Sequence, residues 1–141
     1  MILLDTDHLS VLKYLDNPKC VHLSTRMEAS PETNFATTIA TVEEQMRGWL
    51  GQIARRHDPL KQVSDYEQLA NLFDFFRKWK IIPFNIPAAK QFKILRNQRI
   101  RIGTMDLKIA AIALVNDALL LSGNLRDFRQ VPGLRVENWL E

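Results

Sequence analysis

The sequence predicts an α/β domain of three layers, with a mostly parallel central sheet between two layers of helices. Short apolar runs such as Ile2–Leu4 and Ala118–Leu121 have the composition of strands that are buried on both faces. Segments with helical spacing of apolar residues alternate with these runs, and such alternation indicates strand–helix–strand units. No repeat or change in composition divides the 141 residues, so we expect a single domain over residues 1–141.

The elements expected in the first half of the chain are, in order, a strand at Ile2–Leu4, a helix that Thr6 or Asp7 caps and that ends before Asn17, a helix at Cys20–Ala29, a strand at Phe35–Ile39, a helix from Thr41 to about Arg56, and a helix from near Ser64 to about Trp79. A Ser or Thr followed three residues later by Glu forms a capping box. Both Thr41–Glu44 and Ser64–Glu67 have this pattern, so each predicts the start of a helix.

The elements expected in the second half are a strand at Ile81–Phe84, a helix at Pro87–Asn97, a helix at Met105–Asn116, a strand at Ala118–Leu121, a short helix that Asn124 caps, and a last strand near Arg135–Val136. Pro83 indicates an edge strand or a strand end, because proline cannot donate a hydrogen bond to a neighbouring strand. Thr104 is expected to cap the helix that follows the basic loop.

The composition is that of an ordinary soluble globular protein, with 46% hydrophobic and 25% charged residues. The single cysteine, Cys20, excludes an internal disulfide and a cysteine-rich zinc site, and a small buried residue is the simplest interpretation. No apolar run approaches the roughly 20 residues of a membrane span. The start of the chain resembles a first strand and not a signal peptide, so we expect a cytoplasmic protein.

The formal net charge is +3, and basic residues concentrate in one stretch of the chain. This stretch contains Lys90, Lys93, Arg96, Arg99, Arg101 and Lys108, with Asp106 as its one acid. A basic stretch around a carboxylate suits a polyanionic substrate, but a solvated helix face has the same composition.

Acidic residues follow several of the predicted strands at positions that suggest one shared site. They are Asp5, Glu44, Asp106 and Asp127. In parallel sheets the ligand site lies beyond the carboxyl ends of the strands. Taken singly, each acid in a first helical turn is explained by the helix dipole, and Glu44 also completes a capping box. Taken together, four converging carboxylates repel one another unless cations lie between them.

Oxygen ligands without His or Cys suit Mg²⁺ or Mn²⁺. Such ions activate a water molecule and stabilise the charge that develops on a phosphate during hydrolysis. Carboxylates beside Lys and Arg therefore predict a phosphodiester hydrolase, provided that the predicted topology brings the acids together.

These motifs, taken in order, resemble PIN-domain proteins of the VapC toxin type over nearly the whole chain. The segments that carry the resemblance are Ile2–His8, Ile39–Gly48, Asp106–Ala111, Leu121–Phe128 and the ending Val131–Trp139. The resemblance implies a three-layer α/β/α fold and an endoribonuclease that acts as the toxin of a type II toxin–antitoxin pair. It also implies a homodimer and a small antitoxin, whose tail enters the acidic groove.

The resemblance assigns roles to individual side chains. Asp5 and Asp106 would be direct ligands of Mg²⁺ or Mn²⁺, while Asp127, and often Glu44, act partly through water or a second ion. Supporting polar positions match Thr6, Ser122 and Asn124. Arg47, Arg96, Arg99, Arg101 and Lys108 are the candidate RNA-binding residues.

Two positions depart from the pattern of the family. Asp7 stands where Asn is common, and it is either a helix cap or an additional acid near the metal. Gln45 stands where Leu is usual. Arg47 lies one helical turn beyond Glu44 on the same face, so it contacts RNA or pairs with Glu43 or Glu44.

Two other classes of function remain open. Asp5 and Asp7 after a first strand also suit an aspartate-nucleophile phosphatase of the haloacid dehalogenase kind, although that interpretation leaves Glu44 without a role. A receiver-like domain or a non-catalytic module that binds RNA or protein is the third class. A receiver needs an Asp after its third strand, where this chain has Asn85.

Overall fold

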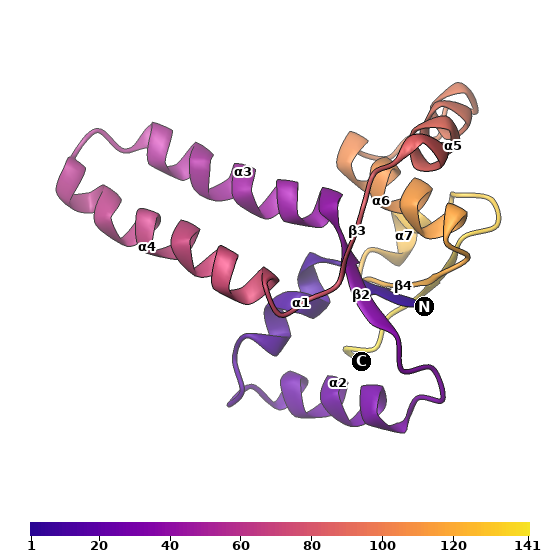
Figure 1. The fold of residues 1–141 in the computed structure, drawn as a ribbon, viewed down its shortest axis with the longest axis horizontal. Helices are drawn as coiled ribbons and strands as arrows, with labels where there is room; N and C mark the ends of the chain where they lie inside the picture. Colours follow the sequence, from indigo (N-terminus) through magenta and orange to yellow (C-terminus); the bar gives the residue numbers. More distant parts are fainter.

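The computed structural model describes residues 1–141 and contains a five-stranded sheet of order β3-β2-β1-β4-β5 (Figure 1). The strands are β1 (Ile2–Leu4), β2 (Phe35–Thr38), β3 (Ile81–Ile82), β4 (Leu119–Leu121) and β5 (Arg135–Glu137). All four pairings are parallel, which confirms the predicted α/β class. The strand after Lys80 lies at the edge of the sheet, where Pro83 predicted it.

The helices are α1 (Thr6–Leu12), α2 (Pro18–Ala29), α3 (Ile39–Arg55), α4 (Pro59–Phe76), α5 (Ile86–Asn97), α6 (Thr104–Val115) and α7 (Leu125–Phe128). Figure 1 shows α1 and α2 on one side of the sheet and α5, α6 and α7 on the other, while α3 and α4 form an arm that extends from the body. None of these helices combines the length and the apolar character needed to cross a lipid bilayer.

The side chains of β1 show why the fold has three layers. Leu3 packs into one core with residues of α5, α6 and α7. Ile2 and Leu4 point to the opposite face and pack with residues of α1, α2 and α4. Successive side chains of a strand point to opposite faces, so an uninterrupted apolar strand needs a covered core on each side. The buried run that predicted the parallel sheet therefore also accounts for both helical layers.

Four helices begin earlier than the capping patterns predicted. The N-cap of α6 is Gly103, and Thr104, the predicted cap, is the first residue of that helix. Asp5 caps α1 in place of Thr6 or Asp7, and its side chain accepts from the Thr6 backbone N–H. Thr38 caps α3 and accepts from Thr41 N–H, so the capping box that begins at Thr41 does not form. Asp58 caps α4, and the second predicted capping box lies inside that helix. Pro59 explains this last correction, since proline favours the first helical position.

The predicted helix around Leu15 is shorter than expected, because α1 ends at Leu12 and Leu15 is exposed. Phe73 has the helical spacing of the apolar residues Leu69, Leu72 and Phe76 in α4, but it is exposed, whereas Leu72 and Phe76 are buried. The buried face of α4 is therefore narrower than the spacing of its apolar residues suggests. Cys20 is buried and free, as expected.

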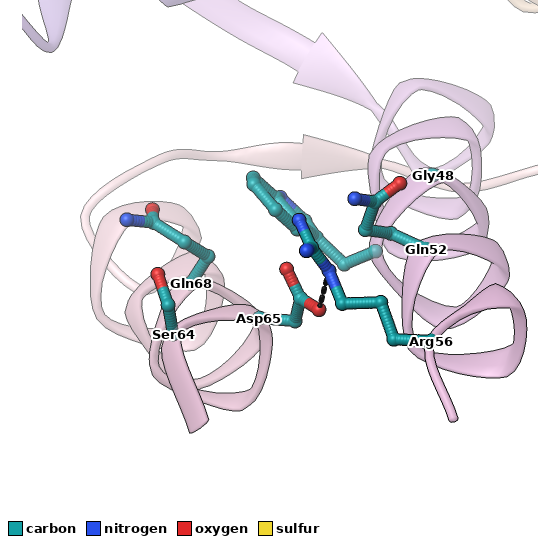
Figure 2. Close-up of a pocket in the computed structure, with 7 residues that line it drawn as sticks. Gly48, Gln52, Arg56, Ser64, Asp65 and Gln68 are labelled. Atoms are coloured by element: carbon teal, nitrogen blue, oxygen red, sulfur yellow. Dashed lines mark ion pairs between the residues drawn. The ribbon is translucent and has the colours of Figure 1, made fainter. Parts of the chain in front are cut away.

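An ion pair joins the outer ends of the two helices in the α3–α4 arm (Figure 2). Nε of Arg56 lies 2.7 Å from Oδ2 of Asp65, whose side chain is almost fully buried. The N–H is not aligned with this contact, so we regard it as an ion pair without a hydrogen bond. Gln62 adds hydrogen bonds from its Nε2 to the carbonyl oxygens of Ile53 and Arg56. These contacts hold α3 and α4 together at the outer end of the arm, away from the carboxyl edge of the sheet.

Candidate active site

The predicted acids come from separate segments that end at the carboxyl edge of the sheet. Asp5 directly follows β1, and Glu44 lies in α3, which follows β2. Asp106 and Asp127 lie in the first turns of α6 and α7. The topology therefore places all four acids at one edge of the sheet, as the sequence predicted. Hydrogen bonds from neighbouring polar residues connect the acids to one another.

Asp5 is the most buried of these four acids, with 8% of its surface exposed. Its Oδ1 accepts from the Thr6 backbone N–H at 2.8 Å, and its Oδ2 accepts from the Ser122 hydroxyl at 2.9 Å. Burial raises the pKa of Asp5 to about 6, the negative charges of Asp7 and Asp106 add to the rise, and the two hydrogen bonds oppose it. A cation beside this carboxylate would relieve the cost of its charge.

Asn124 connects the other two predicted metal ligands. Its Nδ2 donates to Oδ2 of Asp127 at 3.0 Å and to Oδ2 of Asp106 at 3.3 Å. Burial raises the pKa of Asp106, and the charges of Glu44 and Asp127 raise it further. The side-chain amide of Asn124 donates to two acids, which explains why this residue makes no side-chain capping hydrogen bond to α7.

Ser122 and Asn124 also contact each other, because the Asn124 backbone N–H donates to Ser122 Oγ at 3.1 Å. The loop between β4 and α7 therefore forms a continuous chain of hydrogen bonds from Asp5, through Ser122 and Asn124, to Asp106 and Asp127. The three acids are held in one arrangement by two residues of a single loop.

Glu44 has a different environment from the one its sequence pattern suggests. Because Thr38 caps α3, the carboxylate of Glu44 is not used in a capping box, and that interpretation is wrong. Instead Glu44 Oε1 accepts from the Thr6 hydroxyl at 2.9 Å. Thr6 contacts Asp5 through its backbone and Glu44 through its side chain, so it connects the fourth acid to the site.

Asp7 does not cap α1, since Asp5 is the cap, and both oxygens of Asp7 accept protein hydrogen bonds. Its negative charge contributes to the raised pKa of Asp5 and of Asp106, so a role as an additional acid near the metal stays a prediction. Oδ1 accepts from the His8 backbone N–H at 2.7 Å and lies 2.7 Å from His8 Nδ1. Oδ2 accepts from the Gly123 N–H at 2.6 Å. Burial alone would raise the pKa of Asp7, but the hydrogen bonds from His8 and Gly123 outweigh it and the pKa is lowered. Sequence reasoning missed His8, and the uncommon Asp at position 7 was its one signal.

The candidate RNA-binding residues are exposed, apart from the half-buried Lys108, and three of them contact another side chain. Arg47 pairs with Glu43 through a 2.6 Å contact and not with Glu44. Arg96 lies over the ring of Phe92, and Lys108 lies over the ring of Phe84. Arg96, Arg99 and Arg101 are exposed in or just after α5, before the helix that carries Asp106. Their role toward RNA stays a prediction.

The donor set fits a hard cation in its chemistry, because it consists of carboxylate oxygens held by hydrogen bonds. As the side chains stand, no three Asp, Glu, His or Cys groups lie close enough to hold one ion among them. Mg²⁺ commonly binds through one or two carboxylates and keeps several water ligands. The residues therefore fit an ion that Asp5 and Asp106 would bind directly, with water molecules as its other ligands. Asp127 and Glu44 would act through water and not as direct ligands.

The fold and the acidic cluster define a class of protein, an α/β domain with carboxylates at the carboxyl edge of a parallel sheet. Comparison with known proteins finds sequence relatives that are named VapC ribonucleases. The chain is 42% identical over 60 residues to ribonuclease VapC1 of Rickettsia felis, covering 40% of this chain and 45% of the relative. It is 32% identical over 85 residues to ribonuclease VapC2 of Haemophilus influenzae, covering 56% and 64%. The chain thus spans about half of the length of the curated relatives that it matches.

The fold comparison extends over the whole chain. A chain in the crystal structure of VapBC2 from Rickettsia felis, bound to a DNA fragment from its promoter, has a TM-score of 0.72 and 23% identity, with 99% of each chain covered. No protein-family model matches the chain. The structural likeness shows the fold, and the local sequence matches carry the VapC name, so the resemblance indicated by the motifs is confirmed.

Proposed function

We propose that this chain is a metal-dependent endoribonuclease, using Mg²⁺ or Mn²⁺, and the toxin of a type II toxin–antitoxin pair. The observation that carries the proposal is the Ser122–Asn124 loop, which connects Asp5 to Asp106 and Asp127. The pKa values of Asp5 and Asp106 are raised, as expected for carboxylates of a metal site when no cation is bound. The ribonuclease names of the relatives support the RNA substrate.

The bound cation supplies Lewis-acid stabilisation of the phosphate and makes water a better nucleophile. Asp5 and Asp106 would hold it. Asp127 or Glu44 orients the attacking water and accepts its proton, and Asn124 and Thr6 fix the direction of these two carboxylates. The exposed basic residues Arg96, Arg99 and Arg101 hold the RNA backbone.

The proposed partner of the toxin is a small antitoxin with a basic tail, because an arginine in such a tail would complement the four carboxylates at the edge of the sheet. The complex in which the R. felis neighbour was solved supports this partner. A homodimer in the cytoplasm is the proposed state of the free toxin, in keeping with the family resemblance.

The phosphatase alternative requires Asp7 to act as an acid or base toward a substrate. Both of its oxygens instead accept hydrogen bonds from the protein, at His8 and at Gly123. The alternative also gives no role to Glu44, whose carboxylate contacts Thr6 beside Asp5. The nuclease proposal accounts for all of these contacts, and so does better than the phosphatase.

The test is cleavage of a labelled RNA by the wild type, Asp5→Asn and Asp106→Asn in Mg²⁺ or Mn²⁺. Each site variant should reduce the cleavage rate by about 100-fold or more, because it removes a charge from the reacting centre. The matched control is Asp74→Asn, since the Asp74 side chain is 74% exposed on α4. We expect this control to cleave like the wild type and EDTA to stop cleavage. Equal rates for the wild type and both site variants would overturn the proposal.

A further inference from the structure

His8 is a fully buried histidine that contacts two separate parts of the chain. Its Nδ1 lies 2.7 Å from Oδ1 of Asp7, and its Nε2 lies 3.1 Å from the backbone N of Trp139. The Trp139 N–H is a donor, so Nε2 must accept and the ring carries its proton on Nδ1. That proton points at Asp7. The ring therefore has one fixed tautomer, which connects the C-terminal segment to α1.

The other oxygen of Asp7 lies against a residue with no side chain. Oδ2 accepts the Gly123 N–H at 2.6 Å, and a Cβ at position 123 would stand 2.7 Å from the same oxygen. The close approach of Asp7 thus requires glycine at this position. Gly123 lies between Ser122 and Asn124, the two residues that connect the catalytic acids.

We propose that His8, acting through Asp7, is a positioning residue that fixes the Ser122–Asn124 loop against Asp5, Asp106 and Asp127. The contacts run from Trp139 to His8, from His8 to Asp7 and from Asp7 to Gly123. His8 does not touch the reacting atoms, and its effect on cleavage passes through the loop. The inference deepens the proposed nuclease function and rests on it.

The pairing explains why Asp replaces the Asn that is common at position 7. The donors His8 Nδ1–H and Gly123 N–H face the two oxygens of Asp7, one each. A carboxylate accepts at both oxygens, whereas an amide accepts at one end and donates at the other. An Asn at position 7 beside His8 would therefore place a donor against a donor. Asp7 and His8 form a matched pair in this chain.

Two substitutions of His8 separate its contacts. His8→Asn keeps a donor near the position of Nδ1 and loses the acceptor for Trp139. His8→Gln keeps an acceptor near the position of Nε2 and loses the donor to Asp7. We expect His8→Gln to lower kcat about 10-fold or more with KM nearly unchanged, as for other residues that orient catalytic groups, and His8→Asn to stay within about 3-fold of the wild type.

Asp7→Asn and Gly123→Ala test the same contacts outside the buried ring, and both should lower kcat as His8→Gln does. Because the pair acts as a unit, Asp7→Asn combined with His8→Gln should be no slower than Asp7→Asn alone. Gly48→Ala is the control for the glycine change, since nothing lies within 4 Å of a Cβ there. A role in stability alone predicts instead that the His8 variants lose activity equally, in step with their melting temperatures, and that result would overturn the proposal.

Amide hydrogen exchange of the metal-free protein tests the positioning without any substrate. We expect the Gly123 and Asn124 amides to exchange several-fold faster in His8→Gln than in the wild type, and His8→Asn to match the wild type. Equal exchange in all three proteins would overturn the inference even if the wild type cleaves RNA. A wild type that does not cleave RNA, with the expected exchange pattern, would instead remove the nuclease proposal and leave the loop contacts established.

Discussion

A buried carboxylate that is charged at neutral pH carries an electrostatic cost, and Asp5 carries it in this fold. Burial raises its pKa to about 6 from the usual 3.8, with the charges of Asp7 and Asp106 adding to the effect. The hydrogen bonds from Thr6 and Ser122 reduce this cost but do not remove it. Such a residue favours binding of a cation over stability of the metal-free fold.

Asp5→Asn should therefore stabilise the metal-free protein at neutral pH. The folded state holds the Asp5 proton more tightly than the unfolded state, so this residue favours folding most below about pH 4, and the contribution is lost as the pH rises through about 6. One pKa unit corresponds to about 1.4 kcal/mol, so the loss is about 3 kcal/mol at most. We expect the variant to gain about 1–3 kcal/mol at pH 7.5.

Urea unfolding in EDTA at pH 4.5 and pH 7.5 measures this effect. The stability difference between Asp5→Asn and the wild type should be small at the lower pH and larger at the higher one, while Asp74→Asn shows no such change. An Asp5→Asn variant that is less stable than the wild type at pH 7.5 would show that the charge on Asp5 is not costly in the fold.

At the scale of elements, the starts of the long helices were predicted less well than their presence. The pattern Ser64–Glu67 has the residues of a capping box, but Pro59 and Asp58 already begin α4 before it. Likewise Thr38, the last residue of β2, caps α3 before the pattern at Thr41 is reached. A capping pattern shows only that a local sequence is able to cap a helix. The position where the preceding strand or loop ends determines which residue becomes the N-cap.

The start of α4 allows a paired test of this correction. Asp58 Oδ1 accepts from the Leu60 N–H at 3.0 Å, whereas Ser64 lies inside the helix. Asp58→Ala should cost about 1 kcal/mol, the usual effect of removing an N-cap. Ser64→Ala should be neutral or stabilise by a few tenths of a kcal/mol, because alanine has the higher helix propensity. Urea unfolding of both variants measures the difference, and a larger loss for Ser64→Ala would contradict the assigned start.

At the scale of the whole molecule, the sheet could be predicted because two of its central strands, β1 and β4, are apolar on both faces. Leu3 and Leu4 of β1 enter opposite cores. The acids could be predicted as a group because parallel strands end at one edge. The contact between His8 and Trp139 could not, since it joins residues 131 positions apart and leaves no periodic pattern in the sequence.

The central claim is that Asp5 and Asp106, far apart in the sequence, belong to one metal site. Calorimetric titration of the wild type, Asp5→Asn and Asp106→Asn with Mn²⁺ tests it without any RNA. Each substitution would remove one of the two proposed carboxylate ligands, so we expect each to weaken Mn²⁺ binding by about 10-fold or more, and Asp74→Asn to bind like the wild type. Binding that is unchanged in both site variants would contradict the claim.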